Sequence, residues 1–248
     1  MKRDILGLFL GVVFCAHPCL AQPLMASDQR LVVGRLPCAR PQNPRAYGIR
    51  QLMWELMKRT SIEAEMESVQ VDPGGPDLFK TPFLVWACEG PVAALDAKAL
   101  TNLKHFLVLG SFLWIDDPAA KPGGDFDRSV RQTVSLLVEG KALSELRLNH
   151  VLFKSFFLVE RAAGRVLSAP LAGLDVGGRV AVVYTGNDVL GAVSKDLYGN
   201  WENVCLPGGE QQREMSFRLG INIVCYALCL DYKNDRVHLP FILRRRRV

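Results

Sequence analysis

The stretch Gly110-Ser111-Phe112-Leu113-Trp114-Ile115-Asp116-Asp117 decides the predicted fold of this chain. Its short apolar run is typical of a buried β-strand, and it ends in two adjacent carboxylates. In an open α/β sheet, ligands bind just beyond the carboxyl ends of the parallel strands. Asp116 and Asp117 therefore either line a binding or catalytic site, or cap the turn that leaves the strand.

Strand-like and helix-like segments alternate on both sides of this stretch. Continuous apolar runs predict buried strands, and apolar residues spaced three or four apart predict helices. The predicted strands are 31–36, 65–71, 83–87, 112–115 and 179–184, and the predicted helices are 44–59, 96–109, 125–137 and 210–230. Residues 141–178 have a less regular pattern. The alternation indicates an α/β protein with a mostly parallel sheet and helices on both faces.

The N-terminal residues are typical of a secretory signal peptide. Basic Lys2 and Arg3 precede an apolar core over residues 5–16, which is shorter than the roughly 20 residues that span a bilayer. Small residues favour cleavage after Ala21. We expect an exported, periplasmic or extracellular protein, with a signal peptide over 1–21, a single domain over 22–243 and a basic tail over 244–248. A signal that is retained as an anchor is the open alternative.

The charge distribution restricts the classes of partner. The formal net charge is +5, and four of the positive charges are Arg244, Arg245, Arg246 and Arg247. The rest of the chain is close to neutral, which argues against a nucleic-acid-binding face. The arginine tail is either a solvated terminus or a contact for an anionic membrane surface or an acidic partner. No segment after the signal is both long and apolar enough to span a membrane.

Five cysteines follow the predicted cleavage site: Cys38, Cys88, Cys205, Cys225 and Cys229. An oxidising compartment permits one or two disulfides among them, and the pairing stays open. Cys225 and Cys229 lie four residues apart on a predicted helix, where we expect small core residues rather than a bridge. Cys88 adjoins Glu89, which opposes thiolate formation, so we expect it to be buried or bridged.

Several segments resemble the bacterial family called domain of unknown function 4159, from about Arg30 to Arg247. They are residues 59–61, 78–84, 110–117, 149–150, 187–188, 218–222, 232–235 and 238–241. That family is in turn similar to the class I glutamine amidotransferase-like domains, including the trehalose-utilisation type. The resemblance implies a flavodoxin-like, doubly wound sheet.

The catalytic amidotransferases carry a cysteine nucleophile on a glycine-flanked turn after the strand that corresponds to residues 112–115. This chain has Asp116-Asp117-Pro118 at that place. It also has Gly110-Ser111 where the family commonly has Gly-Gly, and His150-Val151 where it commonly has His-Pro. We therefore expect no acyl transfer of the amidotransferase type.

Glu89, Asn187 and Asp188 follow other predicted strands, and His150 precedes the short apolar run 151–153. The candidate pocket consists of Asp116, Asp117, Asn187, Asp188, Glu89 and His150. Asp116, Asp117 and Asp188 are the candidate metal ligands, because divalent cations prefer carboxylate oxygens. The sequence contains no strong metal motif and no phosphate-binding loop, so no cofactor is predicted.

Two classes of function follow. The first is an exported binding or assembly protein without catalytic activity, whose partner is a small ligand or a cell-envelope protein. The second is a hydrolase or a divalent-ion-dependent enzyme that uses the strand-end acids. Carboxylates that share one open cleft would favour the enzyme, whereas carboxylates that cap turns or pair with arginines such as Arg128 or Arg131 would favour the binding protein.

Overall fold

The computed structural model describes residues 30–40, 45–138 and 140–229. The predicted signal peptide and the C-terminal basic tail lie outside these residues. The first residue of the first predicted helix, Pro44, also lies outside them.

The described residues form one mixed sheet of seven strands in the order β2-β1-β3-β4-β7-β6-β5. The first five strands in this order are parallel, whereas β6 is antiparallel to both β7 and β5. The strands are β1 (Val33–Arg35), β2 (Val69–Gln70), β3 (Phe83–Trp86), β4 (Phe112–Asp116), β5 (Ser144–Glu145), β6 (Ala172–Val176) and β7 (Arg179–Thr185).

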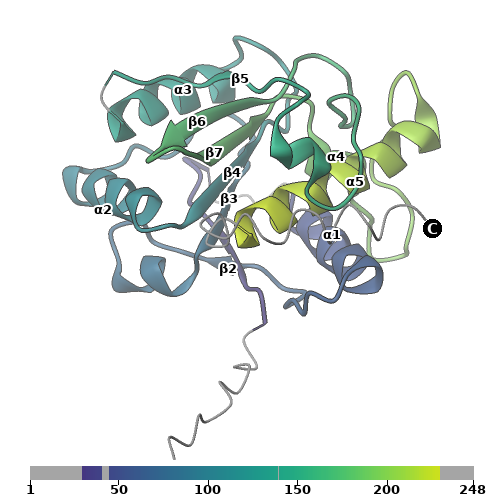
Figure 1. Ribbon diagram of the computed structural model, residues 1–248, viewed down its shortest axis with the longest axis horizontal. Coiled ribbons are helices and arrows are strands. Elements are labelled where there is room, and N and C mark those ends of the chain that lie inside the picture. The colour runs from purple at the N-terminus through teal and green to yellow at the C-terminus, as the bar shows by residue number, and fades with distance from the viewer. Residues whose placement is uncertain (1–29, 41–44, 139, 230–248) are drawn as a thin grey trace, which may run out of the picture.

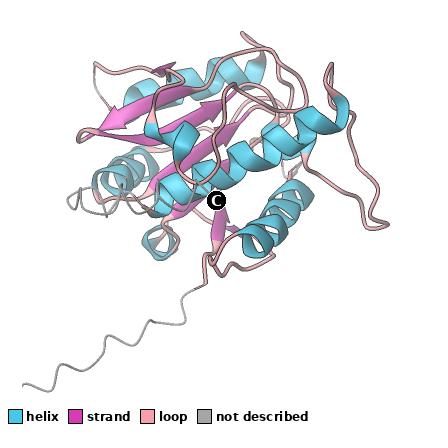
Figure 2. Ribbon diagram, turned by 45° about the vertical axis from the view of Figure 1, so that its right-hand side comes forward, coloured by secondary structure: helices cyan, strands magenta, loops and turns pink. Residues whose placement is uncertain are grey.

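Helices cover both faces of the sheet, as Figures 1 and 2 show. One core lies between the sheet and α1 (Ala46–Arg59), α4 (Val189–Ala192), α5 (Gly209–Leu228) and the 3-10 helix η2 (Val151–Lys154). The other core lies under α2 (Ala97–Val108), α3 (Asp125–Leu137) and the 3-10 helix η1 (Pro76–Lys80). This arrangement confirms the predicted α/β class and is consistent with a flavodoxin-like layered fold.

The position of β4 between two cores explains why residues 112–115 are apolar without interruption. Phe112 and Trp114 belong to the core under α1 and α5, whereas Leu113 and Ile115 belong to the core under α2 and α3. Successive strand side chains point to opposite faces, so a strand covered on both faces needs apolar residues at every position.

Several predicted boundaries differ from the structure. The second strand is Val69–Gln70 rather than 65–71, and α5 ends at Leu228 rather than 230. Residues 141–178 contain β5, η2 and β6. Asp96 caps α2, because its carboxylate accepts a hydrogen bond from the Ala99 amide at 2.7 Å.

One disulfide joins Cys38, after β1, to Cys88, after β3. Cys225 is buried in the core, as expected. The expectation for Cys229 was wrong: this residue lies just past the end of α5 and is exposed. Within the described ranges, no helix is both long and apolar enough to cross a membrane.

Candidate functional site

Parallel pairing of β4 with β7 brings most of the predicted site residues together. Asp116 is the register partner of Thr185, and the Asp117 amide donates to the Thr185 carbonyl at 2.9 Å. Asp116 and Asp117 therefore lie beside Asn187 and Asp188, which follow β7.

Asp116 is fully buried and joins β4 to the residues that follow β7. Its carboxylate accepts hydrogen bonds from the Thr185 hydroxyl at 2.7 Å, the Val189 amide at 2.9 Å and the Leu190 amide at 2.8 Å. Burial, together with the negative charge of Asp188, raises the pKa of Asp116 to about 7, although the three hydrogen bonds oppose this. The carboxylate holds the end of β7 and the first turn of α4 in place.

Asp188 is held by two arginines. Arg45 binds it through Nε at 2.6 Å and through a second guanidinium nitrogen at 2.8 Å, and Arg165 binds it through Nε at 2.6 Å. Each arginine also donates to the Pro118 carbonyl at 3.2 Å. The cluster ties the start of α1, the turn after β4 and the loop before β6 to the end of β7.

Asp117 caps the turn after β4. Its carboxylate accepts hydrogen bonds from the Ala119 amide at 3.0 Å and the Lys121 amide at 3.1 Å. Burial and the negative charge of Asp127 raise the pKa of Asp117, although the hydrogen bonds from the two amides oppose this. Asp116, by contrast, interacts with Asp188. The two adjacent carboxylates therefore have separate surroundings and separate structural partners.

Asn187 anchors a loop. Its side-chain oxygen accepts from the Ser168 and Ala169 amides at 2.8 Å, and its side-chain nitrogen donates to the Ala169 carbonyl at 2.8 Å. Glu89 is exposed after β3, and its charge acts on Arg45.

His150 lies away from the carboxylates. Its Nδ1 accepts from the Leu152 amide at 3.2 Å, and its ring packs against Tyr226 with the centroids 5.4 Å apart. The Tyr226 hydroxyl accepts from the Val180 amide, at the start of β7. His150 is thus at the opposite end of β7 from Asp188.

The part of the chain that the structure describes contains no group of three or more His, Cys, Asp or Glu side chains arranged to hold a metal ion. The candidate ligands Asp116, Asp117 and Asp188 accept hydrogen bonds from amides, a hydroxyl and two guanidinium groups instead. The positive charges beside Asp188 also oppose a bound cation.

Arg45 and Arg165 are the residues that sequence reasoning missed. The arginines named from the sequence have other partners: Arg128 pairs with Asp125, and Arg131 pairs with Asp127. Arg45 and Asp188 are 143 positions apart in the chain, and no local pattern indicates their pairing.

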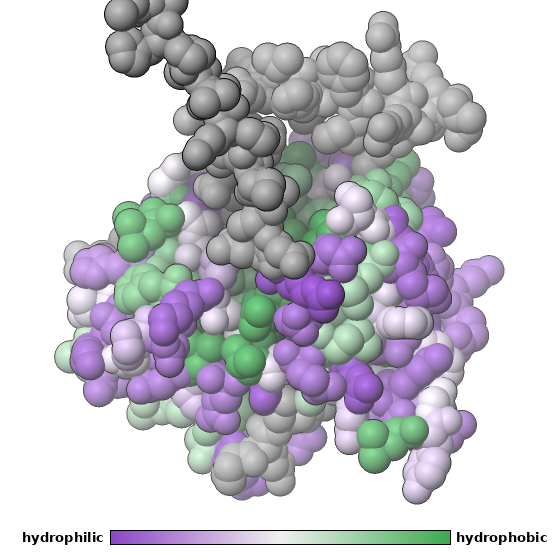
Figure 3. Space-filling model, turned by 90° about the horizontal axis from the view of Figure 1, so that it is seen from below, coloured by the Kyte–Doolittle hydropathy of each residue, from purple (hydrophilic) through white to green (hydrophobic). Residues whose placement is uncertain are grey.

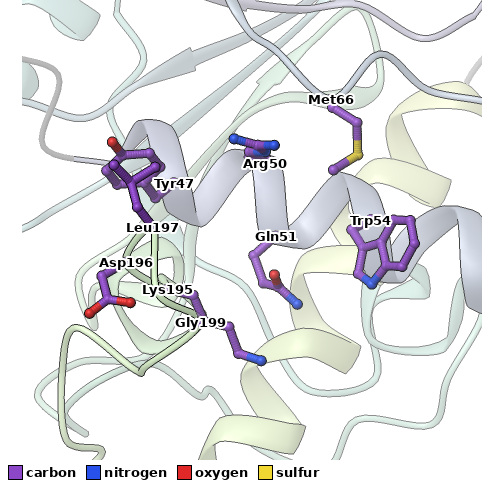
Figure 4. A pocket seen from close by; sticks show the side chains of 9 residues that line it. All are labelled: Tyr47, Arg50, Gln51, Trp54, Met66, Lys195, Asp196, Leu197 and Gly199. Carbon is purple, nitrogen blue, oxygen red and sulfur yellow. The ribbon is translucent and has the colours of Figure 1, made fainter.

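Open grooves lie apart from the carboxylates. The α1 groove, about 340 Å³, is lined by Tyr47, Arg50, Gln51, Trp54, Met66, Lys195, Asp196, Leu197 and Gly199 (Figure 4). A second groove, about 450 Å³, lies beside β5, and Asn187 is the predicted site residue that lines it. Viewed from below, hydrophilic side chains cover much of the molecule, with apolar ones in small groups between them (Figure 3).

The fold and the strand-end contacts define a doubly wound α/β protein whose acids at the central strand ends support the structure. A family model described as domain of unknown function (DUF4159) matches residues 40–228, and the chain belongs to this family. A comparison with curated proteins found no match.

Proposed function

We propose that this chain is an exported protein that binds a ligand or partner without catalysing a reaction. Its scaffold would be amidotransferase-like and would lack the Cys-His apparatus. The observation that carries the proposal is the engagement of Asp116, Asp117 and Asp188 by structural donors. A general acid or base must reach a substrate, whereas Asp116 and Asp188 are fully buried.

The cysteines also support a role without nucleophilic catalysis. Cys88 is bonded to Cys38. Burial raises the pKa of Cys205, and it raises that of Cys225 to about 12, so both stay thiols at neutral pH. Where the amidotransferases carry their nucleophile, this chain has Asp116-Asp117-Pro118.

The disulfide supports export, because such bonds persist in oxidising compartments. We propose cleavage near Ala21, a single domain over residues 22–243 and a basic tail over 244–248. A cell-envelope protein is then an accessible partner, and the tail offers contact with an anionic surface.

A hydrolase or ion-dependent enzyme is the second candidate. One observation favours it: a carboxyl with a pKa of about 7, as at Asp116, has the proton affinity that acid–base catalysis needs. Its complete burial and its three donors count against this function.

A thermal-shift experiment separates the two candidates. The purified protein is heated with and without Mg²⁺, Ca²⁺, Mn²⁺ or Zn²⁺, alongside an Asp116→Asn/Asp117→Asn double variant. The binding proposal predicts no rise in Tm with any ion for either protein. An Asp125→Asn variant, which changes an exposed carboxylate, controls for weak surface binding. A rise that the double variant loses and the control keeps would establish an ion site and overturn the proposal.

A further inference from the structure

The α1 groove is built on the outward face of α1. Tyr47, Arg50, Gln51 and Trp54 are spaced three and four residues apart, so they lie along one side of the helix. Core residues such as Leu52 lie on the other side of the helix. Trp54 is 47% exposed and Tyr47 is 39% exposed, which makes the aromatic rings available to a ligand.

A hydrogen-bonded loop forms the opposite wall. The Asp196 carboxylate accepts hydrogen bonds from the Tyr198 amide at 2.9 Å and the Asn200 amide at 2.8 Å. Lys195 pairs with Trp201 across the base of the loop. The Trp201 ring is contacted by Lys195 and by the Arg213 guanidinium, each 4.2 Å from its centroid.

The loop presents two large apolar side chains to solvent. Leu197 is 75% exposed and lines the groove, and the adjacent Tyr198 is 90% exposed. Because Asp196 fixes the backbone of the turn, binding orders the side chains of this segment and not its main chain. Rigid, exposed aromatic and apolar side chains are typical anchors of protein–protein contacts.

The groove is rich in hydrogen-bond donors and in positive charge. Arg50 and Lys195 line it, whereas Lys58, which lies 5.8 Å from the centroid of the Trp54 ring, is paired with Glu55 at 3.2 Å. Arg50 also pairs with exposed Glu67 at 3.5 Å, a surface contact that contributes little and that a ligand carboxylate can replace. Asp196 is the acidic residue among the lining residues, and its carboxylate accepts hydrogen bonds from Asn200 within the loop.

We propose that the α1 groove binds an acidic peptide segment with apolar side chains, supplied by a partner protein. The proposal rests on the proposed binding function and names its partner class. Acidic side chains match Arg50 and Lys195, and apolar ones match Trp54, Leu197 and the adaptable thioether of Met66.

A library of random peptides displayed on phage tests the proposal with the purified protein as the target. The expected result is enrichment of sequences that combine Asp or Glu with Leu, Phe, Trp or Tyr. An enriched peptide is then labelled, and its affinity is measured by fluorescence anisotropy. Leu197→Ser and Arg50→Glu should each weaken binding by at least about tenfold, or ~1.4 kcal/mol. Added salt should weaken binding further.

Two matched variants control for exposure and charge. Leu109 is 73% exposed just past the end of α2, on the other face of the sheet, and Arg128 pairs with an exposed acid on α3. Leu109→Ser and Arg128→Glu should leave the affinity unchanged. Circular dichroism confirms that each variant folds.

Other outcomes overturn the proposal. They are absent enrichment, enrichment of basic sequences, equal losses in the control variants, and binding of polygalacturonate, an anionic glycan, without peptide binding. None of these outcomes depends on Asp116 or on divalent ions, so failure of this proposal is distinguishable from a positive result in the ion experiment.

Discussion

Asp188 shows how one residue can fix several segments. Its φ of 55° is the left-handed region, which Asp and Asn tolerate better than most residues. The carboxylate then faces Arg45 and Arg165 and also accepts from the Gly191 amide at 3.0 Å. An arrangement that resembles a catalytic acid in the sequence is therefore a structural junction.

Replacing Asp188 with Asn tests this junction. Asn keeps the size and tolerates the backbone angle, but it leaves two guanidinium groups without their counter-charge. We expect the free energy of unfolding to fall by about 3 kcal/mol, as for other broken buried pairs. Urea unfolding measures the change. Asp125→Asn breaks the exposed pair with Arg128 and should cost less than about 1 kcal/mol; equal losses would contradict the assignment.

Asp116 gives the protein a pH dependence. Its pKa rises from an ordinary 3.8 to about 7 on folding, so the folded state binds its proton more tightly than the unfolded state. The resulting stability is fully present below pH 3.8 and is lost as the pH rises through about 7, by up to about 1.4 kcal/mol per pH unit.

Urea unfolding from about pH 5 to about pH 8 checks this dependence. The wild-type free energy of unfolding should fall over this range more steeply than that of Asp116→Asn. Asp127→Asn is the comparison, because amide and arginine contacts lower the pKa of Asp127 despite burial, so its titration lies below the range. Identical slopes in wild type and Asp116→Asn would show that another group is responsible.

The limits of sequence reasoning are clear at these residues. The apolar run of β4 and the acids after it were identified because both signals are local. The hydrogen-bond donors of these acids were not predicted. Arg45 and Arg165 contact Asp188, and the Leu190 amide contacts Asp116, only because the fold brings together residues that are far apart in the chain. Whether a strand-end acid is available for chemistry depends on those donors.

At the scale of elements, close packing of helices decides how α1 is placed. A Cβ atom on Gly48 would lie 2.2 Å from the Leu190 carbonyl oxygen, so α1 and α4 approach through glycine. Strand β6 shows the same dependence on space. Its Gly173 faces Val180 and Leu146, yet Gly and Asp are rare in strands, which explains why the sequence pattern missed β6.

Gly48→Ala should destabilise the protein, although Ala favours helices by about 1 kcal/mol. The new methyl group meets backbone that cannot move without shifting α4, and we expect a net loss of about 1–3 kcal/mol in chemical unfolding. Gly220→Ala on α5 is the matched control. Its Cβ would meet the two methyl groups of Leu52 at 2.9 and 3.0 Å, and the end of a side chain shifts at a lower cost than the backbone of α4. A smaller loss at Gly48 than at Gly220 would contradict the packing argument.

At the scale of the whole molecule, the α/β class and the mostly parallel sheet were predicted from the alternating pattern, whereas the strand order and the disulfide were not. Five cysteines left the pairing open, and the structure joins Cys38 to Cys88 across 50 positions. The bond connects the chain after β1 with the chain after β3, neighbouring strands in the sheet.

Removal of the disulfide should lower stability by up to about 4 kcal/mol, the loop-closure entropy for a loop of this length. Urea unfolding of Cys38→Ala/Cys88→Ala against wild type measures the loss, and a reducing agent should reproduce it in the wild type. Cys229→Ser changes an exposed thiol and should respond to the reducing agent as the wild type does. A wild-type unfolding midpoint that does not change when the reducing agent is added would argue against the bond.

The two outermost strands of the described sheet, β2 and β5, are only two residues long. Long flat edges recruit strands from other chains and seed aggregation, whereas short edges expose few unpaired backbone groups. The short edge strands of the described sheet thus disfavour growth by strand addition, even though the sheet is open in topology. This protects the protein at high concentration and directs any partner towards its helices and loops.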